Sequence, residues 1–460
     1  MKKWLKMCSV GLTIAVTAGL FVGCGQDSSN SDSSVKRVVV WSGETHSKLA
    51  YEKLVNEYNE GEGKEKGVHL DYQVKDNSTY NQTIELALKN GDAPDIFSGT
   101  MDKLVEENYI VAIDDLPGGP EYLEKYKDYL EEDRTSYNGK TYRVPVSMTT
   151  RGLIYNKDMF KAAGIVDENG EAKPPKTWAE LRETAKKLTN PEKKEYGIIL
   201  PAKYSNWYGS DIGETLQTSV GFDGYNPVTG EYDYSGIIPI AQTYLDMKAD
   251  GSVYPGAEGL DNDPARAQFA AGNIGMKLAY SFDVGVLTDQ FPATCDWGVA
   301  PLPVTVEGER YKSRASISMS MFINSKSVET VGGEALMEVF KFLTSDKVIQ
   351  ELYKEGINLP YDAKLVEGIE ISDNPQWQAF ADLVAQSAQP VTQPKTDATY
   401  TISENTEFVN KVWSGEETPA QFVERLEESK NQARASYYEM HPDEDINASV
   451  KPDWNVKISE

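Results

Sequence analysis

The sequence predicts an α/β protein of two lobes, and three observations lead to this fold class. The 460 residues include 40% hydrophobic side chains, enough for two or three cores. Short β-branched runs alternate with segments in which apolar residues recur at helical spacing. The order of strand, helix and strand is typical of a parallel sheet with right-handed crossovers.

The first lobe is predicted from a repeated strand and helix pattern at the start of the chain body. The expected elements are a strand at 37–41, a helix at 51–58, a strand at 68–74, a helix over 80–88 that stops at Gly91, and a strand at 94–97. Ligands of parallel sheets sit beyond the carboxyl ends of the strands. Residues 41–44 and 98–101 are therefore expected to face one crevice.

The second lobe is predicted to begin where the chain leaves this pattern, near residues 142–145. Thr177 and Glu180 form a capping-box pattern that opens a helix. The other expected elements are strands at 153–156, 196–200, 275–280, 297–303 and 315–323, and helices at about 235–249, 335–344, 346–353 and 375–438. The last twenty residues, rich in acids and with two prolines, are expected to form an extended tail, 441–460.

The charge balance excludes some partners. Asp and Glu number 72 against 46 Lys and Arg, for a formal net charge of −26. No dense basic block interrupts this excess, so neither nucleic acid nor an anionic membrane surface is an expected partner.

Cysteine and histidine usage excludes other classes of site. Only Cys295 lies in the body of the chain, so no internal disulfide or cysteine-based zinc site is expected there. His46, His69 and His441 are far apart in sequence and match no metal-ligand pattern. Neither a metal nor a cofactor is expected, and Cys295 is interpreted as an inert thiol.

The N-terminus predicts export and lipid attachment. Residues 1–23 combine a basic start with an apolar run too short to span a membrane, as in a secretory signal peptide. The run ends in Phe21-Val-Gly-Cys24, which resembles a bacterial lipobox except that Phe21 stands where an aliphatic residue is usual. Residues 24–35, rich in Ser, then form a flexible tether. Cleavage before Cys24 removes three lysines, so the mature charge is −26 − 3 = −29. The alternative is a plain signal peptide cut elsewhere, with Cys24 an incidental thiol.

Several short motifs, in a fixed order, resemble one protein family. They are GDAPDI at 91–96, VP at 144–145, LIYNKDMF at 153–160, PKTW at 175–178, FAAG at 269–272, VAPLP at 299–303, FKFLTS at 340–345 and SGEETP at 414–419. Each motif alone is weak. Together, from residue 37 to about residue 433, they resemble the family 1 extracellular solute-binding proteins of bacterial ABC importers, which include maltose- and oligosaccharide-binding proteins.

This resemblance implies a two-lobe periplasmic-binding-protein-like fold of type II, in which each lobe is a mainly parallel sheet flanked by helices, with a hinge between the lobes. Lobe one would comprise residues 36–146 and 315–360, and lobe two residues 147–314 and 361–440. The implied function is a monomeric receptor, lipid-anchored on the outer face of the cell membrane, that carries a solute to a membrane permease and has no catalytic residue.

The resemblance also implies which residues contact the ligand. They lie in loops at strand ends, at a crossover and on aromatic platforms: Trp41, Ser42, Glu44, Ser98, Thr149, Trp207, Tyr208 and Phe282. Phe282 stands where Trp is common in the family, and Thr149 where the maltose binders have a carboxylate.

The same side chains suit a di- or oligosaccharide, because sugar rings pack on aromatic planes and their hydroxyls bind carboxylates and amides. Three alternatives stay open. A secreted glycoside hydrolase is possible in principle with so many acids, although no GxSxG, P-loop or HExxH motif is found. A receptor of the same fold could instead take a polyamine or glycerol phosphate. An adhesin without a small ligand has no specific support.

Overall fold

Two β-sheets organise the chain in the computed structural model, which describes residues 35–76, 79–132, 134–369 and 374–458. The predicted signal peptide and the lipid site at Cys24 lie outside the described residues. Among the residues described, no helix is both long enough and apolar enough to cross a membrane.

The first sheet has four strands in the order β13-β3-β1-β2. β1 (Lys36–Ser42) is parallel to β2 (Val68–Val74) and to β3 (Ile96–Phe97), whereas β13 (Phe322–Ile323) is antiparallel to β3. The parallel arrangement predicted for the first lobe is confirmed. The predicted helix stop is confirmed as well, since Gly91 ends α3 (Tyr80–Asn90) with a left-handed φ of 79°.

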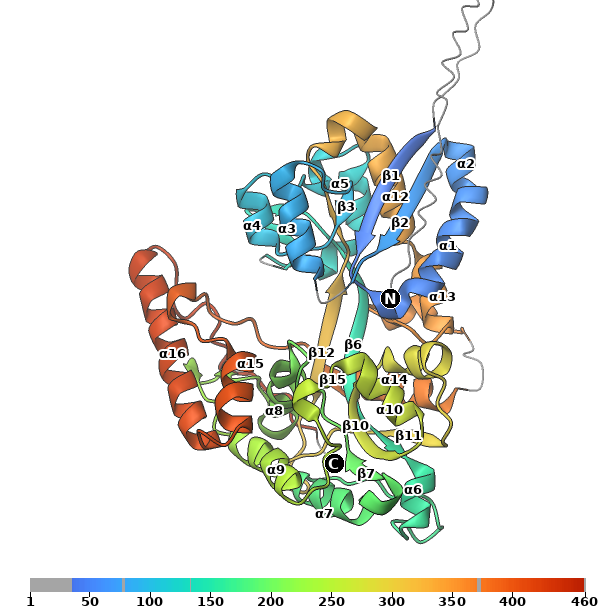
Figure 1. The fold of residues 1–460 in the computed structure, drawn as a ribbon. Coiled ribbons are helices and arrows are strands. Elements are labelled where there is room, and N and C mark those ends of the chain that lie inside the picture. Colours follow the sequence, from blue (N-terminus) through green and yellow to red (C-terminus); the bar gives the residue numbers. More distant parts are fainter. Residues whose placement is uncertain (1–34, 77–78, 133, 370–373, 459–460) are drawn as a thin grey trace, which may run out of the picture. The chain divides into compact units, whose positions relative to one another are not determined.

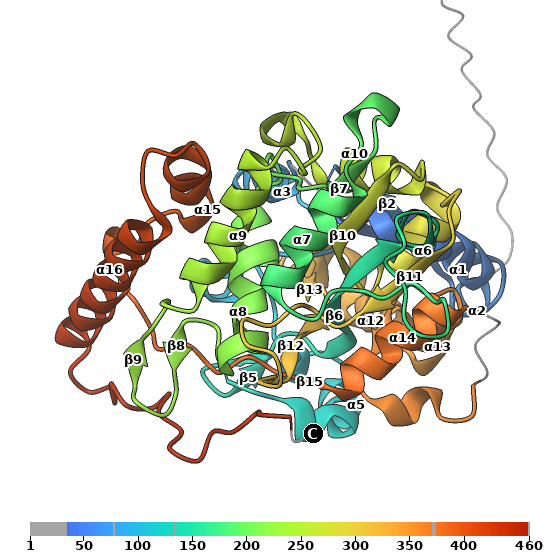
Figure 2. The same cartoon turned by 90° about the horizontal axis from the view of Figure 1, so that it is seen from below.

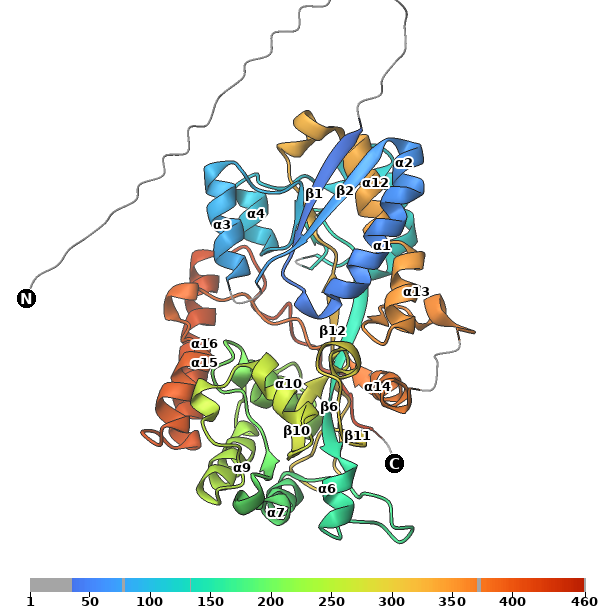
Figure 3. The same ribbon diagram turned by 45° about the vertical axis from the view of Figure 1, so that its right-hand side comes forward.

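Each face of the first sheet has its own apolar core. On one face, Val38 and Val40 of β1 pack with α1 (Lys48–Glu60) and α12 (Gly333–Leu343). On the other face, Phe97 packs with α3 and α4 (Met101–Glu106). Figure 3 shows α1 and α2 alongside β2, with α3 and α4 on the other side of β1. The alternation of side chains along a strand produces this division.

The second sheet corrects one expectation, because it is mixed rather than mainly parallel. Its strands are ordered β15-β12-β6-β10-β7, and β11 and β14 also pair with β6. β6 (Pro145–Asn156) is antiparallel to β10, β11, β12 and β14. The strands β10 and β7, and β12 and β15, pair in parallel. The reason is that β6 enters this sheet from the first lobe and runs against its neighbours.

The chain passes between the two lobes along β6, β12 and the segment at β14 (Leu359–Pro360). Val144, just before β6, belongs to the core of the first sheet, whereas Leu153 within β6 belongs to the largest core of the second. Figure 1 shows β6 and β12 (Ser313–Met319) side by side, in agreement with their pairing.

Helices cover the second sheet. Trp178 begins α7 (Trp178–Leu188), and Thr177 and Glu180 form the predicted capping box. Figure 2 shows α7 beside α9 (Ile237–Ala249). The remaining strands are β4 (Ser136–Tyr137), β5 (Lys140–Thr141), β7 (Tyr196–Ile198), β8 (Tyr225–Asn226), β9 (Glu231–Tyr232), β10 (Ile274–Tyr280), β11 (Trp297–Ala300) and β15 (Ser387–Ala388). The remaining α-helices are α2 (Glu62–Lys66), α5 (Gly119–Leu123), α6 (Lys157–Ala162), α8 (Glu214–Val220), α10 (Asn262–Ala270), α11 (Asp283–Gly285), α13 (Asp346–Lys354), α14 (Pro375–Ala385), α15 (Glu404–Glu407) and α16 (Pro419–Met440).

The segment after α16 differs from the expected extended tail, because turns occur at 442–443, 446–449 and 452–453, and it is bound to the second lobe. The carbonyl of Val456 accepts from the Lys312 amide at 2.8 Å, and the Ile458 amide donates to the Arg310 carbonyl at 2.9 Å. The indole of Trp454 donates to the Gly221 carbonyl at 2.9 Å. These bonds hold the predicted tail against the second lobe beside the start of β12.

Candidate functional site

Three of the predicted ligand residues lie together at the strand ends of the first lobe. Ser42, Glu44 and Ser98 line one cavity of about 60 Å³, which Ser147 of β6 and Met319 of β12 also line. Ser42 is 0% exposed, so a ligand cannot reach it, contrary to the prediction. Its hydroxyl accepts a hydrogen bond from the Glu44 amide at 3.0 Å and orders the loop after β1. The carboxyl ends of β1 and β3 therefore meet at the crossing strands, as parallel pairing requires.

Trp41 and Thr149 lie outside that cavity. Trp41 is half-buried, its carbonyl accepts from the Tyr80 hydroxyl at 2.9 Å, and the ammonium of Lys75 lies 4.1 Å from its ring centroid. Thr149 is half-buried on β6 and donates to the Ser316 carbonyl at 3.4 Å. The Trp41 ring thus already carries a cation of the chain itself on one face.

Phe282 follows β10 in the second lobe and is half-buried. Its ring stacks on Tyr280, with the centroids 5.1 Å apart and the planes at 17°. The Tyr280 hydroxyl donates to the Glu214 carboxylate at 3.1 Å. Burial raises the pKa of Glu214 from its ordinary value. Phe282, Tyr280 and Glu214 thus form a cluster of two stacked aromatic rings and one hydrogen-bond acceptor.

The structure contradicts the prediction that Trp207 and Tyr208 are ligand platforms. Their side chains are 0% and 1% exposed and belong to the largest core of the second lobe. Trp207 makes an edge contact with Trp413 at 5.2 Å between centroids, and Tyr208 packs on Phe408 at 5.2 Å. Residues some two hundred positions later in the chain cover both rings, and a ligand cannot reach them.

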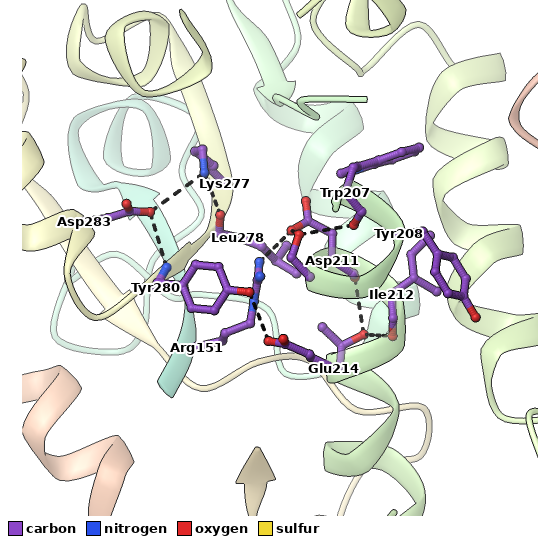
Figure 4. Close-up of polar contacts among 12 residues, drawn as sticks. Arg151, Trp207, Tyr208, Asp211, Ile212, Glu214, Lys277, Leu278, Tyr280 and Asp283 are labelled. Atoms are coloured by element: carbon purple, nitrogen blue, oxygen red, sulfur yellow. Dashed lines mark hydrogen bonds and ion pairs between the residues drawn. The ribbon is translucent and has the colours of Figure 1, made fainter. Parts of the chain in front are cut away.

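A buried ion pair that the sequence analysis did not single out lies beside Tyr280 (Figure 4). Arg151 donates to the Asp211 carboxylate at 2.6 Å, and the two side chains are 3% and 6% exposed. The guanidinium carbon of Arg151 lies 4.2 Å from the Tyr280 ring centroid. Arg151 thus supports the Tyr280 ring, which stacks on Phe282, and Asp211 neutralises the charge of Arg151.

A second buried cluster lies under Phe282. Asp283 accepts from Arg266 Nε at 2.9 Å, and the Lys277 ammonium lies 3.9 Å from its other oxygen. The Lys277 ammonium donates to the Leu278 carbonyl at 2.9 Å, as Figure 4 shows. Burial lowers the pKa of Lys277 to about 8. The positive charges beneath the ring are therefore held by Asp283.

The third pair lies where β12 meets the second lobe. Arg314 contacts Asp223 at 2.9 Å, and Gln393 donates to the other oxygen of this carboxylate at 2.8 Å. Each of the four basic residues around Tyr280, Phe282 and Glu214, namely Arg151, Arg266, Lys277 and Arg314, is thus paired with a carboxylate. The surroundings of the stacked rings offer no unpaired cation among these residues.

A sequence signal for these residues exists. Arg151 and Lys277 are single charges inside apolar strands, and a charge at such a position is tolerated only with a buried partner. Neither partner follows from spacing, since Asp211 lies sixty positions after Arg151.

Replacing Lys277 by Met tests the cost of this buried charge. In the native protein the pKa of Lys277 is lowered from 10.5 to about 8, so between these values the unfolded chain binds more protons and stability rises with pH. Lys277→Met removes the charge and with it this pH dependence. We therefore expect the gain in unfolding free energy of the variant over wild type to be about 2–3 kcal/mol larger at pH 7 than at pH 10. Urea unfolding of both proteins at the two pH values measures the difference, and an equal effect at both would contradict a buried charge.

Comparison with known proteins places the chain among binding proteins. A family model described as bacterial extracellular solute-binding protein matches residues 42–350, more than half of the chain. A maltotriose-binding protein of Pyrococcus abyssi is 24% identical over 329 residues, 69% of this chain and 65% of that protein. An sn-glycerol-3-phosphate-binding periplasmic protein of Brucella melitensis is 26% identical over 248 residues, 51% of this chain and 52% of that protein. The chain thus spans between half and two thirds of the length of these two curated relatives.

Solved structures share the fold. The GacH receptor of Streptomyces glaucescens, described in complex with acarbose, aligns with a TM-score of 0.67 at 19% identity, over 89% of this chain and 99% of that chain. At this identity the likeness concerns the fold alone, which is the two-lobe type II fold expected from the sequence.

Proposed function

This chain belongs to the bacterial extracellular solute-binding proteins, and from that premise we propose that it is a receptor that binds a neutral sugar, a di- or oligosaccharide, and delivers it to the permease of an ABC importer. The sugar would bind between lobe one (36–146 and 315–360) and lobe two (147–314 and 361–440). The sugar must contact both lobes at once, because a ligand that binds the open and closed forms equally does not shift the equilibrium between them.

The observation that carries this proposal is the stacked pair of Tyr280 and Phe282 beside Glu214. Tyr280 supports the Phe282 ring, whose plane would take the C–H face of a sugar, and the carboxylate would accept hydrogen bonds from the sugar hydroxyls. On the first lobe, Glu44 and Ser98 would supply polar contacts, and Trp41 and Thr149 would complete the site. Ser42 is buried and would act only by ordering the loop that carries Glu44. Trp207 and Tyr208 are not part of it.

The charges around the rings favour a neutral ligand over glycerol phosphate. A phosphate needs a cation that is free to pair with it, as an arginine fork does. Arg151, Arg266, Lys277 and Arg314 already pair with carboxylates in the structure. Breaking a buried pair for each ligand molecule would cost much of the binding energy.

A thermal-shift panel tests the proposed function. The secreted protein, carrying Cys24→Ser to prevent acylation, is heated with mono- and oligosaccharides including maltotriose, and with polyamines and glycerol phosphate. A ligand at about a hundred times Kd adds about 2.7 kcal/mol to stability. Shifts with a group of sugars, recovered unhydrolysed, support the receptor; a shift only with glycerol phosphate or a polyamine, or hydrolysis of the sugar, contradicts it.

Phe282→Ala tests the platform itself. We expect this change to weaken binding of the identified sugar by about 1 kcal/mol, a fivefold rise in Kd, because the ring contributes stacking beyond its buried area. Isothermal titration measures it. Tyr400→Ala removes an exposed aromatic ring elsewhere on the protein and should leave Kd unchanged.

We also propose that the receptor is a monomer, lipid-anchored at Cys24 on the extracytoplasmic face of the cell membrane and held there by the 24–35 tether. The lipobox pattern before Cys24 supports this placement. Mass spectrometry of the N-terminal peptide from membranes should find an acylated Cys24, and an unmodified peptide that begins elsewhere contradicts it.

A further inference from the structure

His46 connects the two lobes at the proposed platform. It lies in the short 3-10 turn Thr45–Ser47 after β1, and its ring stacks on Phe282 with the centroids 4.4 Å apart and the planes at 23°. Gln290 of the second lobe donates to the carbonyls of His46 at 3.0 Å and Thr45 at 3.3 Å. The turn is therefore held to the second lobe by a ring stack and by two hydrogen bonds.

This stack uses ring surface that a ligand needs. Phe282 already carries Tyr280, and His46 covers a further part of the ring with its centroid 4.4 Å from that of Phe282. We propose that His46 is a built-in competitor of the ligand: its imidazole occupies the stacking surface of Phe282, and a sugar binds there only when His46 turns away. This inference rests on the proposed function, because it assumes that Phe282 stacks on the ligand.

The structure provides a place for the displaced ring. A cavity of about 300 Å³ adjoins the stack and is lined by His46 itself, Lys53, Asp289, Gln290 and Glu355, among others. Lys53 in this cavity pairs with Glu355 at 3.1 Å, which leaves Asp289 as the carboxylate that a displaced imidazole could meet. The cavity therefore suits a protonated ring better than a neutral one.

The charges around the stacked imidazole favour its neutral form. Burial lowers the pKa of His46, and the guanidinium of Arg266 on α10 acts in the same direction. Glu44, Asp283 and Asp263 act against this shift, but Asp263 and Asp283 are themselves paired with Arg266. Displacement exposes the ring to water and to Asp289, so the displaced ring binds a proton more readily than the stacked ring does.

The consequence is a ligand affinity that depends on pH. The stacked form binds fewer protons than the displaced form, so a lower pH favours displacement and hence the ligand. With an ordinary pKa of about 6.5 for the displaced ring and a lower pKa for the stacked ring, affinity should rise by up to about tenfold from pH 7.5 to pH 5.5.

Titration calorimetry with maltotriose tests the competition. For wild type we expect Kd to fall, by up to about tenfold, from pH 7.5 to pH 5.5. His46→Ala should bind maltotriose several-fold more tightly than wild type at pH 7.5 and lose most of this pH dependence. His46→Phe keeps a stacking ring without a titrating group, so it should bind weakly at both pH values. His69→Ala, on an exposed position of β2, is the matched control and should behave as wild type. Weaker binding by His46→Ala would make His46 a ligand contact and overturn the inference.

An NMR titration of the His46 ring needs no ligand and separates this inference from the proposed function. The ring signal, assigned by its loss in His46→Ala, should titrate below the ordinary pKa in wild type and near that value in Phe282→Ala. A pKa of ordinary value in wild type, or one that Phe282→Ala leaves unchanged, overturns the stack. If no sugar binds, the proposed function fails, and with it the competition, whereas the stack itself is still decided by the NMR result.

Discussion

Arg151→Met is expected to lower the free energy of unfolding by about 3–5 kcal/mol, because it leaves the Asp211 carboxylate buried without its cation. The two side chains are 3% and 6% exposed, and their contact is 2.6 Å. The Tyr280 ring also loses the guanidinium that lies 4.2 Å from its centroid. Urea unfolding at pH 7 with wild type alongside measures the change.

Two further variants show whether the unpaired charge is the cause. Replacing both members, as Arg151→Met with Asp211→Leu, should restore much of the lost stability, since neither charge is then buried alone. Arg37→Met removes an arginine that pairs with Asp71 at the surface and is 65% exposed, and should change stability by at most about 1 kcal/mol. A loss for Arg151→Met no larger than for Arg37→Met would contradict a buried pair.

Trp207→Ala is expected to cost about 3–5 kcal/mol of stability through the cavity it creates. Trp207 is 0% exposed and contacts Tyr244, Phe408 and Trp413 edge-on. Thermal and urea unfolding measure the loss.

Ligand affinity provides the second half of this test. Because the ring lies in the core and not at the proposed site, the folded variant should bind its sugar with the wild-type Kd. Phe282→Ala is the counterpart, since it should lose affinity with a smaller loss of stability from a half-buried ring. Weak binding by a folded Trp207→Ala protein, with stability unchanged, would return Trp207 to the ligand site.

Part of the proposed site depends on strand order, which the sequence predicts. Ser42, Glu44 and Ser98 follow strands that local β-branched patterns identify, and parallel pairing brings the strand ends together. Phe282 was found by resemblance to a family motif, and its surroundings were not. No local pattern predicts that His46 stacks on Phe282 or that the carboxylate of Asp283 is buried beneath this ring in a pair with Arg266.

By itself the sequence determined the parallel first sheet, the capping box at Thr177, the helix stop at Gly91 and the family. These features depend on residues within a few positions of one another, where periodicity and backbone preference act directly. The tertiary structure alone decided that Trp207 is core, that the second sheet is mixed and that Arg151 pairs with Asp211. Each of these depends on which distant segments pack together: residues 408–413 cover Trp207, and β6 crosses from one lobe to the other. An aromatic residue next to polar neighbours has the same local sequence pattern whether it lies in a loop or in a core. Only the distant segment that packs against it distinguishes the two.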